Sequence, residues 1–329
     1  MATYKEIYGT NVEVLASDPS NPVEGQIWYN STSQTLKGYA LVAGSWATSG
    51  PLNLARNFLG GAGTQTSALA FGGFRASPLT VTGATESYNG TSWTTSPATL
   101  NTVRRALGSC GATNTAALAF GGVNPTPTRL ANNESWNGTS WTELNDLNTA
   151  RSSVAGAGIQ TAALAFGGTA PAITAVNESW NGTTWTELGD LNTARSGSAG
   201  AGTNTAALAF GGYNGATPGR VGNTESWNGT SWTELNDLNT VRESLGGNGI
   251  QTAALAFGGE TPVTGATESW NGSAWTTKNS LNTARAGVAG TGTNTVGLAF
   301  GGEDVTPVIV ASTEEWSGTP LRTVNITVS

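Results

Sequence analysis

A glutamate and an arginine recur in near-identical contexts along the chain, and a carboxylate beside a cation is a pattern that general acid–base catalysis can use. An active site is asymmetric, however, and catalysis needs groups in differing environments. Repeated copies instead favour a buried or half-buried ion pair that fixes the geometry of each repeat. The pairs expected in the repeats are Glu178 with Arg195, Glu225 with Arg242, and Glu268 with Arg285.

Other residues that carry chemistry are scarce. The sequence has no histidine, which excludes Ser-His-Asp and Cys-His catalysis and every histidine-containing metal site. Cys110 is the single cysteine, so it forms no intrachain disulfide, and we interpret it as a small buried apolar residue. Glu303 and Asp304 break the repeat, but adjacent residues of a strand point to opposite faces. The sequence therefore predicts a protein that is not an enzyme and holds no cofactor or metal.

The composition also bounds the partners and the location. The net charge is −7 and only 11% of the residues are charged, which argues against a nucleic-acid partner. No apolar run approaches the roughly 20 residues of a membrane span. The first residues, MATYKEIYGT, lack the apolar core of a secretory signal, so we expect synthesis in a host cytoplasm without a signal peptide.

The triplet Asn-Gly-Thr, as at Asn181–Thr183, satisfies the rule for N-glycosylation. It also recurs where each repeat needs a two-residue hairpin turn, and Asn-Gly is a favoured sequence for such turns. Because the chain shows no signal peptide, we interpret these triplets as turns.

Three sequence markers recur in the same order along the chain, so the chain contains internal repeats. Successive copies of the marker phenylalanine are 43 to 49 residues apart. The markers are the phenylalanine of AFGG, the arginine that closes LN-x-[AV]-R, and the glutamate of E-S-[WY]-N-G. They define six units from about residue 52 to residue 329. The marker phenylalanines are Phe71, Phe120, Phe166, Phe210, Phe257 and Phe300.

Each unit is predicted to contain strands and no helix. In TAALAFGG, Leu164 and Phe166 point to one face while Ala163 and Ala165 point to the other, so a bulky face can meet a small face of a neighbouring sheet. TESWNGTSW is typical of two strands joined at Asn-Gly. Four short strands per unit, repeated radially, describe a propeller blade. We expect blades to start at about residues 52, 100, 147, 191, 238 and 281.

The units resemble the kelch repeat, in which a glycine pair follows an apolar strand, aromatic residues lie on the third and fourth strands, and an arginine opens the next unit. The corresponding residues of one unit are Gly167, Gly168, Trp180, Trp185 and Arg195. The resemblance covers all six units and implies an all-β, six-bladed kelch-like β-propeller. It implies no function, because one fold hosts many functions.

The spacing of the tryptophans indicates how the ring closes. Trp185 lies ten residues before Arg195, and Trp46 lies ten residues before Arg56, so Trp46 occupies a fourth-strand position. The sixth unit has no second tryptophan after Trp316. We therefore expect the segment near Trp46 to supply the outer strand of the last blade, which would leave no free sheet edge. The propeller domain then spans residues 41–329, and residues 1–40 form a separate attachment segment.

The attachment segment contains QIWYN and TLKGY, which are predicted to form a short β-hairpin around STSQ. This stretch resembles bacteriophage tail-fibre and other virion proteins in the form P-x-x-G-x-I-W-Y-N followed by L-K-x-Y. We predict that Ile27, Trp28 and Tyr29 attach the propeller to another virion protein or to another copy of the chain.

The blades differ mostly in the stretch after the glycine pair, which joins the second strand to the third. All six of these loops should lie on one face of the disc, where loops commonly carry function. Arg75, Arg129, Tyr213 and Arg220 are the candidate ligand- or partner-binding residues, because tyrosine and arginine are common interface anchors.

Taken together, these patterns predict a non-enzymatic structural and recognition protein of a phage virion: a tail fibre, an appendage or a capsid-surface component. It would bind a host surface glycan or protein, or another virion protein. One alternative is a bacterial surface adhesion or scaffold propeller. Another is a carbohydrate-active enzyme on a propeller that uses carboxylates such as those of Glu303 and Asp304.

Overall fold

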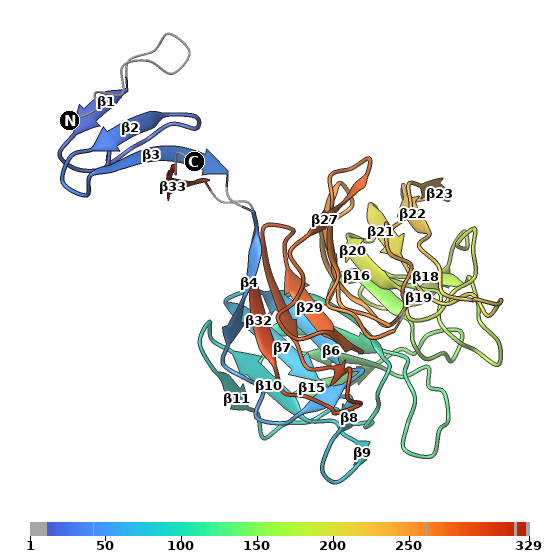
Figure 1. Cartoon of the computed structure of the whole chain (residues 1–329). Coiled ribbons are helices and arrows are strands. Elements are labelled where there is room, and N and C mark those ends of the chain that lie inside the picture. The colour runs from blue at the N-terminus through green and yellow to red at the C-terminus, as the bar shows by residue number, and fades with distance from the viewer. Residues whose placement is uncertain (1–11, 42, 261, 319–320, 327–329) are drawn as a thin grey trace. The chain divides into compact units, whose positions relative to one another are not determined.

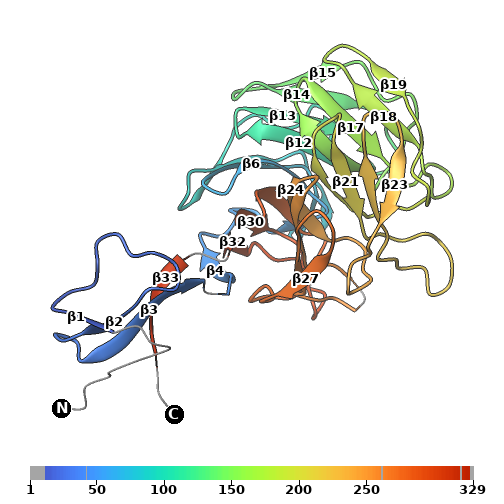
Figure 2. The same cartoon turned by 90° about the horizontal axis from the view of Figure 1, so that it is seen from above.

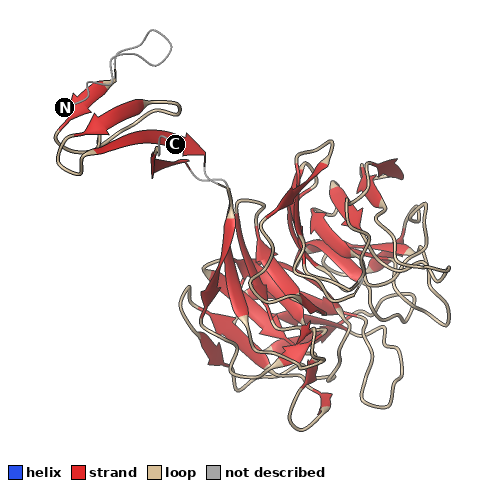
Figure 3. Cartoon of the chain, in the orientation of Figure 1, coloured by secondary structure: helices blue, strands red, loops and turns tan. Residues whose placement is uncertain are grey.

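The computed structural model describes residues 12–41, 43–260, 262–318 and 321–326, and the regular structure within them is entirely β (Figure 3). The chain divides into two compact units (Figure 1). The larger unit is Ser45–Ser317, and the smaller combines Met1–Gly44 with Gly318–Ser329. The prediction of an all-β chain built from four-stranded antiparallel sheets is confirmed for the described residues.

The described part of the larger unit contains six four-stranded antiparallel sheets, here numbered in chain order. From the inner strand outward they are β6 (Gly60–Thr64), β7 (Ser67–Phe71), β10 (Thr85–Tyr88) and β11 (Trp93–Thr95); β12 (Gly108–Thr113), β13 (Ala116–Phe120), β14 (Asn133–Trp136) and β15 (Trp141–Leu144); β16 (Ala155–Ile159), β17 (Ala162–Phe166), β18 (Asn177–Trp180) and β19 (Trp185–Glu187); β20 (Ala199–Gly202), β21 (Ala207–Phe210), β22 (Thr224–Trp227) and β23 (Trp232–Leu235); β24 (Gly246–Ile250), β25 (Ala253–Phe257), β26 (Thr267–Trp270) and β27 (Trp275–Lys278); and β29 (Ala289–Gly292), β30 (Val296–Phe300), β32 (Thr313–Ser317) and β4 (Ser45–Ser49).

The inner strands contact one another in chain order, and β29 of the sixth sheet contacts β6 of the first. Figure 2 shows the sheets of the larger unit from a second direction. Five two-residue strands lie outside the sheets: β5 (Arg56–Asn57), β8 (Phe74–Arg75), β9 (Thr80–Val81), β28 (Arg285–Ala286) and β31 (Glu303–Asp304).

A closed ring of six backbone hydrogen bonds links the sheets just before their inner strands. In each bond an N–H group donates to the carbonyl of the equivalent residue in the preceding sheet, at 2.7–3.0 Å. The bond from Phe58 N to Gly287 O, at 2.8 Å, joins the first sheet to the sixth and completes the ring. All six residues have left-handed backbone angles, with φ between 50° and 62°. The members of this hydrogen-bonded ring are Phe58, Ala106, Ser153, Gly197, Ser244 and Gly287.

The sixth sheet is assembled from both ends of the larger unit. Its outer strand β4 pairs antiparallel with β32, and Trp46 lies opposite Trp316. Two segments more than 260 residues apart in the sequence therefore share one sheet.

The smaller unit forms a four-stranded sheet in the order β1 (Glu13–Leu15), β2 (Ile27–Asn30), β3 (Thr35–Leu41) and β33 (Leu321–Asn325). The division expected from the sequence placed the C-terminal residues in the propeller domain. In the structure β33 pairs antiparallel with β3 instead, from Lys37 opposite Asn325 to Leu41 opposite Leu321. The backbone groups along β3 thereby gain partners, so the C-terminal segment belongs to the smaller unit.

Neighbouring sheets pack with a bulky face against a small one. Leu164 and Phe166 of the third sheet are fully buried and contact Ala207 and Ala209 of the fourth. The ring of Phe166 lies 5.0 Å from that of Trp232. Burying a side chain of leucine or phenylalanine contributes roughly 1.5–3 kcal/mol, and this contact recurs between consecutive sheets.

The outer-strand tryptophans also bind the preceding sheet, but two of them lack a partner among the described residues. Trp275 Nε1 donates to Thr224 Oγ1 at 2.9 Å. The residue equivalent to Thr224 in the third sheet is Asn177, and neither Asn177 Oδ1 nor Trp232 Nε1 has a hydrogen bond there. A threonine in place of Asn177 would supply the missing acceptor.

We expect Asn177→Thr to raise the free energy of unfolding by about 1 kcal/mol, the usual net value of one buried hydrogen bond. The bond from Asn177 Nδ2 to Gly189 O would be lost, but Gly189 is exposed and its carbonyl can bind water. Chemical denaturation measures the change. Asn177→Val is the matched control, because it has the shape of threonine without the hydroxyl. Equal stability of the two variants would contradict the assignment.

Candidate functional site

The hydrogen-bonded ring places the starts of all six inner strands on one side of the larger unit. Because successive strands of each sheet are antiparallel, the connections from second to third strand end on that same side. The connections from each outer strand to the next inner strand lie there too. We call this side the loop face.

The repeated arginines lie beneath the loop face, where each forms an ion pair with a glutamate of the third strand in its own sheet. Their side chains are at most 2% exposed. The pairing expected from the sequence, Glu178 with Arg195, is wrong: Glu178 pairs with Arg151 and Arg195 pairs with Glu225. Each arginine opens the sheet that contains its partner, so the glutamate that follows it is the one within reach. The six pairs are Arg56–Glu86, Arg104–Glu134, Arg151–Glu178, Arg195–Glu225, Arg242–Glu268 and Arg285–Glu314.

The pair in the third sheet shows what these residues do. Arg151 Nη2 donates to Glu178 Oε1 at 2.9 Å and to Ala165 O at 3.1 Å. Glu178 Oε2 accepts the backbone N–H of Asn148 at 2.7 Å and its side-chain amide at 2.9 Å. Burial lowers the pKa of Arg151, and the carboxylate of Glu178 opposes that shift. The pair fastens the incoming connection to the second and third strands, and neither side chain is exposed at the surface.

We expect Glu178→Gln to lower the free energy of unfolding by about 3–5 kcal/mol, because it leaves the buried Arg151 without a counter-charge. Glu187→Gln is the matched control, because it removes the same charge from an exposed position. Glu187 lies opposite Glu178 in the sheet register. Surface changes of that kind are usually within about 0.5 kcal/mol. Denaturant titration of both variants measures the difference, and similar losses would show that burial of the pair contributes little.

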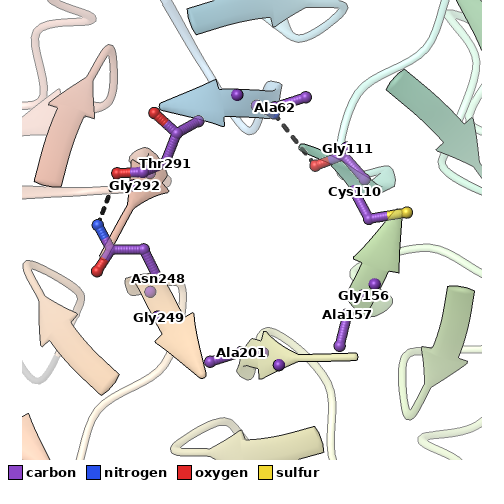
Figure 4. A pocket seen from close by; sticks show the side chains of 18 residues that line it. Ala62, Cys110, Gly111, Gly156, Ala157, Ala201, Asn248, Gly249, Thr291 and Gly292 are labelled. Carbon is purple, nitrogen blue, oxygen red and sulfur yellow. Dashed lines mark hydrogen bonds between the residues drawn. The ribbon is translucent and has the colours of Figure 1, made fainter. Parts of the chain in front are cut away.

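The centre of the ring contains small cavities lined by the inner strands (Figure 4). One has a volume of about 120 Å³ and is bordered mainly by glycine and alanine. Its polar side chains are few: Asn248 Nδ2 donates to Thr291 O at 2.7 Å, and Ser109 Oγ accepts the N–H of Gly61 at 3.1 Å. A cavity of this volume holds a few water molecules and no drug-sized ligand.

Cys110 also borders this cavity, and its side chain is buried. Burial raises the pKa of the Cys110 thiol to about 12, so the thiol stays protonated near neutral pH and is a poor nucleophile. None of the residues that line the central cavities is acidic or basic, so those linings offer no general acid or base for catalysis.

The four candidate binding residues all lie on the loop face but in three different sheets. Arg75 lies on β8, where its backbone pairs with that of Arg56. Arg129 is exposed and its backbone bridges that of Val123. Only Tyr213 and Arg220 are direct neighbours, with their backbones bridged. The four residues therefore mark a surface and no single pocket.

Sequence reasoning missed four residues that make side-chain contacts on the loop face: Glu243, Glu260, Arg105 and Phe74. Arg220 pairs with Glu243, at 3.2 Å from Nε to Oε1, and with Glu260, at 2.8 Å from Nη2 to Oε1. The guanidinium of Arg105 lies 5.1 Å from the ring centre of Phe74 in the preceding sheet, a cation–π contact. All four missed residues directly follow either a marker arginine or a glycine pair. That position is the signal that would have identified them.

The two carboxylates that break the repeat serve different neighbours. Glu303 Oε2 accepts the side-chain amide of Asn57 at 2.8 Å. Asp304 Oδ1 accepts the hydroxyl and N–H groups of Thr306 and the N–H of Val308, and these hydrogen bonds lower the pKa of the Asp304 carboxyl. Asp304 thus orders its own loop.

The candidate attachment residues lie on β2 in the smaller unit. Ile27 and Tyr29 are half-buried, whereas Trp28 is fully buried and its indole donates to Asp18 Oδ1 at 3.1 Å. Trp28 is therefore a core residue here, while its two neighbours retain some accessible surface. The same carboxylate accepts hydrogen bonds from Asn30 at 2.7 Å and Lys37 at 2.8 Å.

Lys37 above all, and then Asn30, hold the pKa of Asp18 at about 2, below its ordinary value near 4. Because the folded-state pKa is depressed, the stabilisation is complete above about pH 4 and is lost as the pH falls through about 2. We expect Trp28 fluorescence to report loosening of the smaller unit in that acid range. Asp18→Asn should remove this pH dependence, and an unchanged acid transition in the variant would contradict the role of Asp18.

The comparisons with known proteins give a fold and no function. No family model and no curated protein matches the sequence. A solved structure titled "Structure of YjhT" matches with a TM-score of 0.69 and 13% identity, over 84% of this chain and 99% of that one. At this identity the likeness shows the fold alone, which is β-propeller-like.

The described residues contain no helix long and apolar enough to cross a membrane. They also contain no group of three or more histidine, cysteine, aspartate or glutamate side chains placed to hold a metal ion.

Proposed function

We propose that this protein is a six-bladed kelch-like β-propeller that works without catalysis, by binding a ligand or partner through its loop face. Six sheets linked head to tail by the hydrogen-bonded ring support the blade number. The glycine pairs and buried arginines of each sheet support the kelch-like assignment.

The observation that carries the proposal is how the chain distributes its charged residues. The repeated arginines and glutamates are buried and serve the fold. The charged residues outside the repeat include several on the loop face, and they differ from sheet to sheet. The first two sheets contribute arginines there, and the last two contribute carboxylates. An asymmetric charged surface on a symmetric scaffold suits recognition of one specific partner. These loop-face residues are Arg75, Arg105, Arg129, Arg220, Glu243, Glu260, Glu303 and Asp304.

The setting that we propose is a phage virion, in which the protein is a tail fibre, an appendage or a capsid-surface component. The support is the resemblance of the segment around Ile27–Asn30 to virion proteins, together with the separate small sheet that contains it. We propose that this sheet attaches the propeller to other virion proteins or to further copies, with Ile27 and Tyr29 as contacts and Trp28 as their support.

Binding to host cells tests the proposal. A variant with alanine at Arg75, Arg129, Tyr213 and Arg220 should lose most cell binding in flow cytometry, because interface anchors of this kind commonly contribute 2 kcal/mol or more each, about 30-fold. The control replaces Thr139, Thr183, Thr230 and Ser273, which are exposed hairpin residues at the opposite ends of the sheets. Unchanged binding of the loop-face variant would contradict recognition through this face. Mass spectrometry of purified particles tests the virion assignment, and absence of the protein from particles would refute it.

A further inference from the structure

Arg129 and Arg220 occupy the same structural position in the second and fourth sheets. Each bridges the residue that directly follows the glycine pair, which is Val123 for Arg129 and Tyr213 for Arg220. In both sheets the residue that follows the arginine donates its backbone N–H to the carbonyl oxygen of the second glycine of the pair, at 2.9 Å. The two arginines therefore leave equivalent points of the backbone.

Their surroundings differ in charge. Arg220 reaches the fifth sheet and pairs with Glu243 and Glu260. Glu243 directly follows a marker arginine, Glu260 directly follows a glycine pair, and their backbones are bridged. The charge of Arg220 is thus neutralised by two carboxylates of the neighbouring sheet.

The sheet next to Arg129 offers hydroxyl groups in place of those carboxylates. Ser152 follows the marker arginine of the third sheet, Thr169 follows its glycine pair, and their backbones are bridged like those of Glu243 and Glu260. Arg129 is exposed and has no ion pair among the described residues. The arginine at this position is therefore neutralised in the fourth sheet and has no carboxylate partner in the second.

A second cation, Arg105, lies on the other side of Val123 from Arg129. The backbone of Val123 bridges both Arg105 and Arg129, so the three side chains project from the same side of this short pairing. Arg105 is held on the ring of Phe74 and also has no ion pair among the described residues. The guanidinium of Arg105 therefore lies toward the first sheet, whereas Arg129 occupies the position from which Arg220 reaches the following sheet. The donors that remain for an anion at the third sheet are the guanidinium of Arg129 and the hydroxyl groups of Ser152 and Thr169.

We propose that Arg129, with the hydroxyl groups of Ser152 and Thr169, binds a carboxylate of an acidic polysaccharide. This inference rests on the proposed recognition role and names the ligand class. The carboxylate would take the place that Glu243 and Glu260 take at Arg220, and it would accept paired N–H groups from the guanidinium of Arg129.

The surrounding loop favours a saccharide over an acidic peptide. Asn124 Oδ1 accepts hydrogen bonds from Thr126 N, Thr126 Oγ1 and Thr128 N, so the loop before Arg129 is ordered and exposes hydroxyl groups. None of the large exposed hydrophobic residues lies in this loop or in that of the third sheet. A peptide partner depends on apolar or aromatic anchors, whereas a sugar acid needs hydrogen-bonding groups and cations.

The first experiment titrates the full chain with an oligosaccharide of hexuronic acids, using calorimetry, beside a neutral oligosaccharide of equal length and a poly-glutamate peptide. We expect saturable binding of the hexuronate alone, weakened by salt. Arg129→Ala should weaken it by about tenfold or more, since hydrogen bonds to charged groups are the strong ones. Binding of the neutral sugar with equal affinity, binding of poly-glutamate with equal affinity, or no binding of hexuronate would each overturn the proposal.

A sharper test exchanges the carboxylates of the fifth sheet with the hydroxyl groups of the third. Ser152→Glu with Thr169→Glu should give Arg129 the internal partners that Arg220 has, and abolish hexuronate binding while the fold is retained. Glu243→Ser with Glu260→Thr should free Arg220 and raise the stoichiometry. Circular dichroism and melting temperature verify folding, and a folded first variant that still binds hexuronate refutes the site.

Cell binding separates this inference from the proposed function. If alanine at Arg75, Arg129, Tyr213 and Arg220 together abolishes cell binding while Arg129→Ala alone has no effect on it, the recognition role stands and the acidic-saccharide site is wrong.

Discussion

The closed ring of six backbone hydrogen bonds is the constraint on which the larger unit depends. Each bond runs from one sheet to the preceding one, so the ring closes only when all six sheets are present and equally oriented. It requires a left-handed backbone at six positions, four of which are not glycine. A left-handed residue other than glycine costs roughly 1–2 kcal/mol, which the surrounding hydrogen bonds and packing must offset. The same ring directs every variable loop to one face.

Beneath that ring, the buried arginine–glutamate pairs convert sequence repetition into geometric repetition. Each pair joins an incoming connection to the second and third strands of its own sheet, as Arg151 and Glu178 do through Ala165 O and Asn148 N. Buried pairs of this kind are costly to form and more costly to break. They therefore favour one register over its alternatives, and they remove the repeated charged groups from contact with any ligand.

In the proposed recognition role, contacts with a ligand therefore fall to residues outside the repeat. Arg220 and Arg129 leave equivalent backbone positions, yet Arg220 is neutralised by Glu243 and Glu260, whereas the sheet that follows Arg129 has Ser152 and Thr169 at the positions of those carboxylates. A symmetric scaffold makes such a difference interpretable, because the neutralised copy shows what the uncompensated copy lacks. The asymmetry lies in a few side chains on the loop face, while each sheet has the same four antiparallel strands.

Local periodicity was sufficient to predict the strands and their two faces. The alternation in TAALAFGG predicted strands with one bulky and one small face, and Leu164 and Phe166 do pack on Ala207 and Ala209. The repeated markers predicted four-stranded antiparallel sheets. Which groups far apart in the chain come into contact depends on the tertiary fold. Glu178 pairs with Arg151 and not with Arg195, because the repeated motif does not show which arginine precedes the first strand of the sheet that contains Glu178.

Tertiary structure also placed β33 on β3 and buried Trp28 above the carboxylate network of Asp18, since backbone pairing and burial depend on partners that no local pattern names. The environments of Arg129 and Arg220 were decided in the same way. The two arginines occupy equivalent positions, and the neighbouring sheet determines whether carboxylates or hydroxyl groups stand at the positions that follow its marker arginine and its glycine pair.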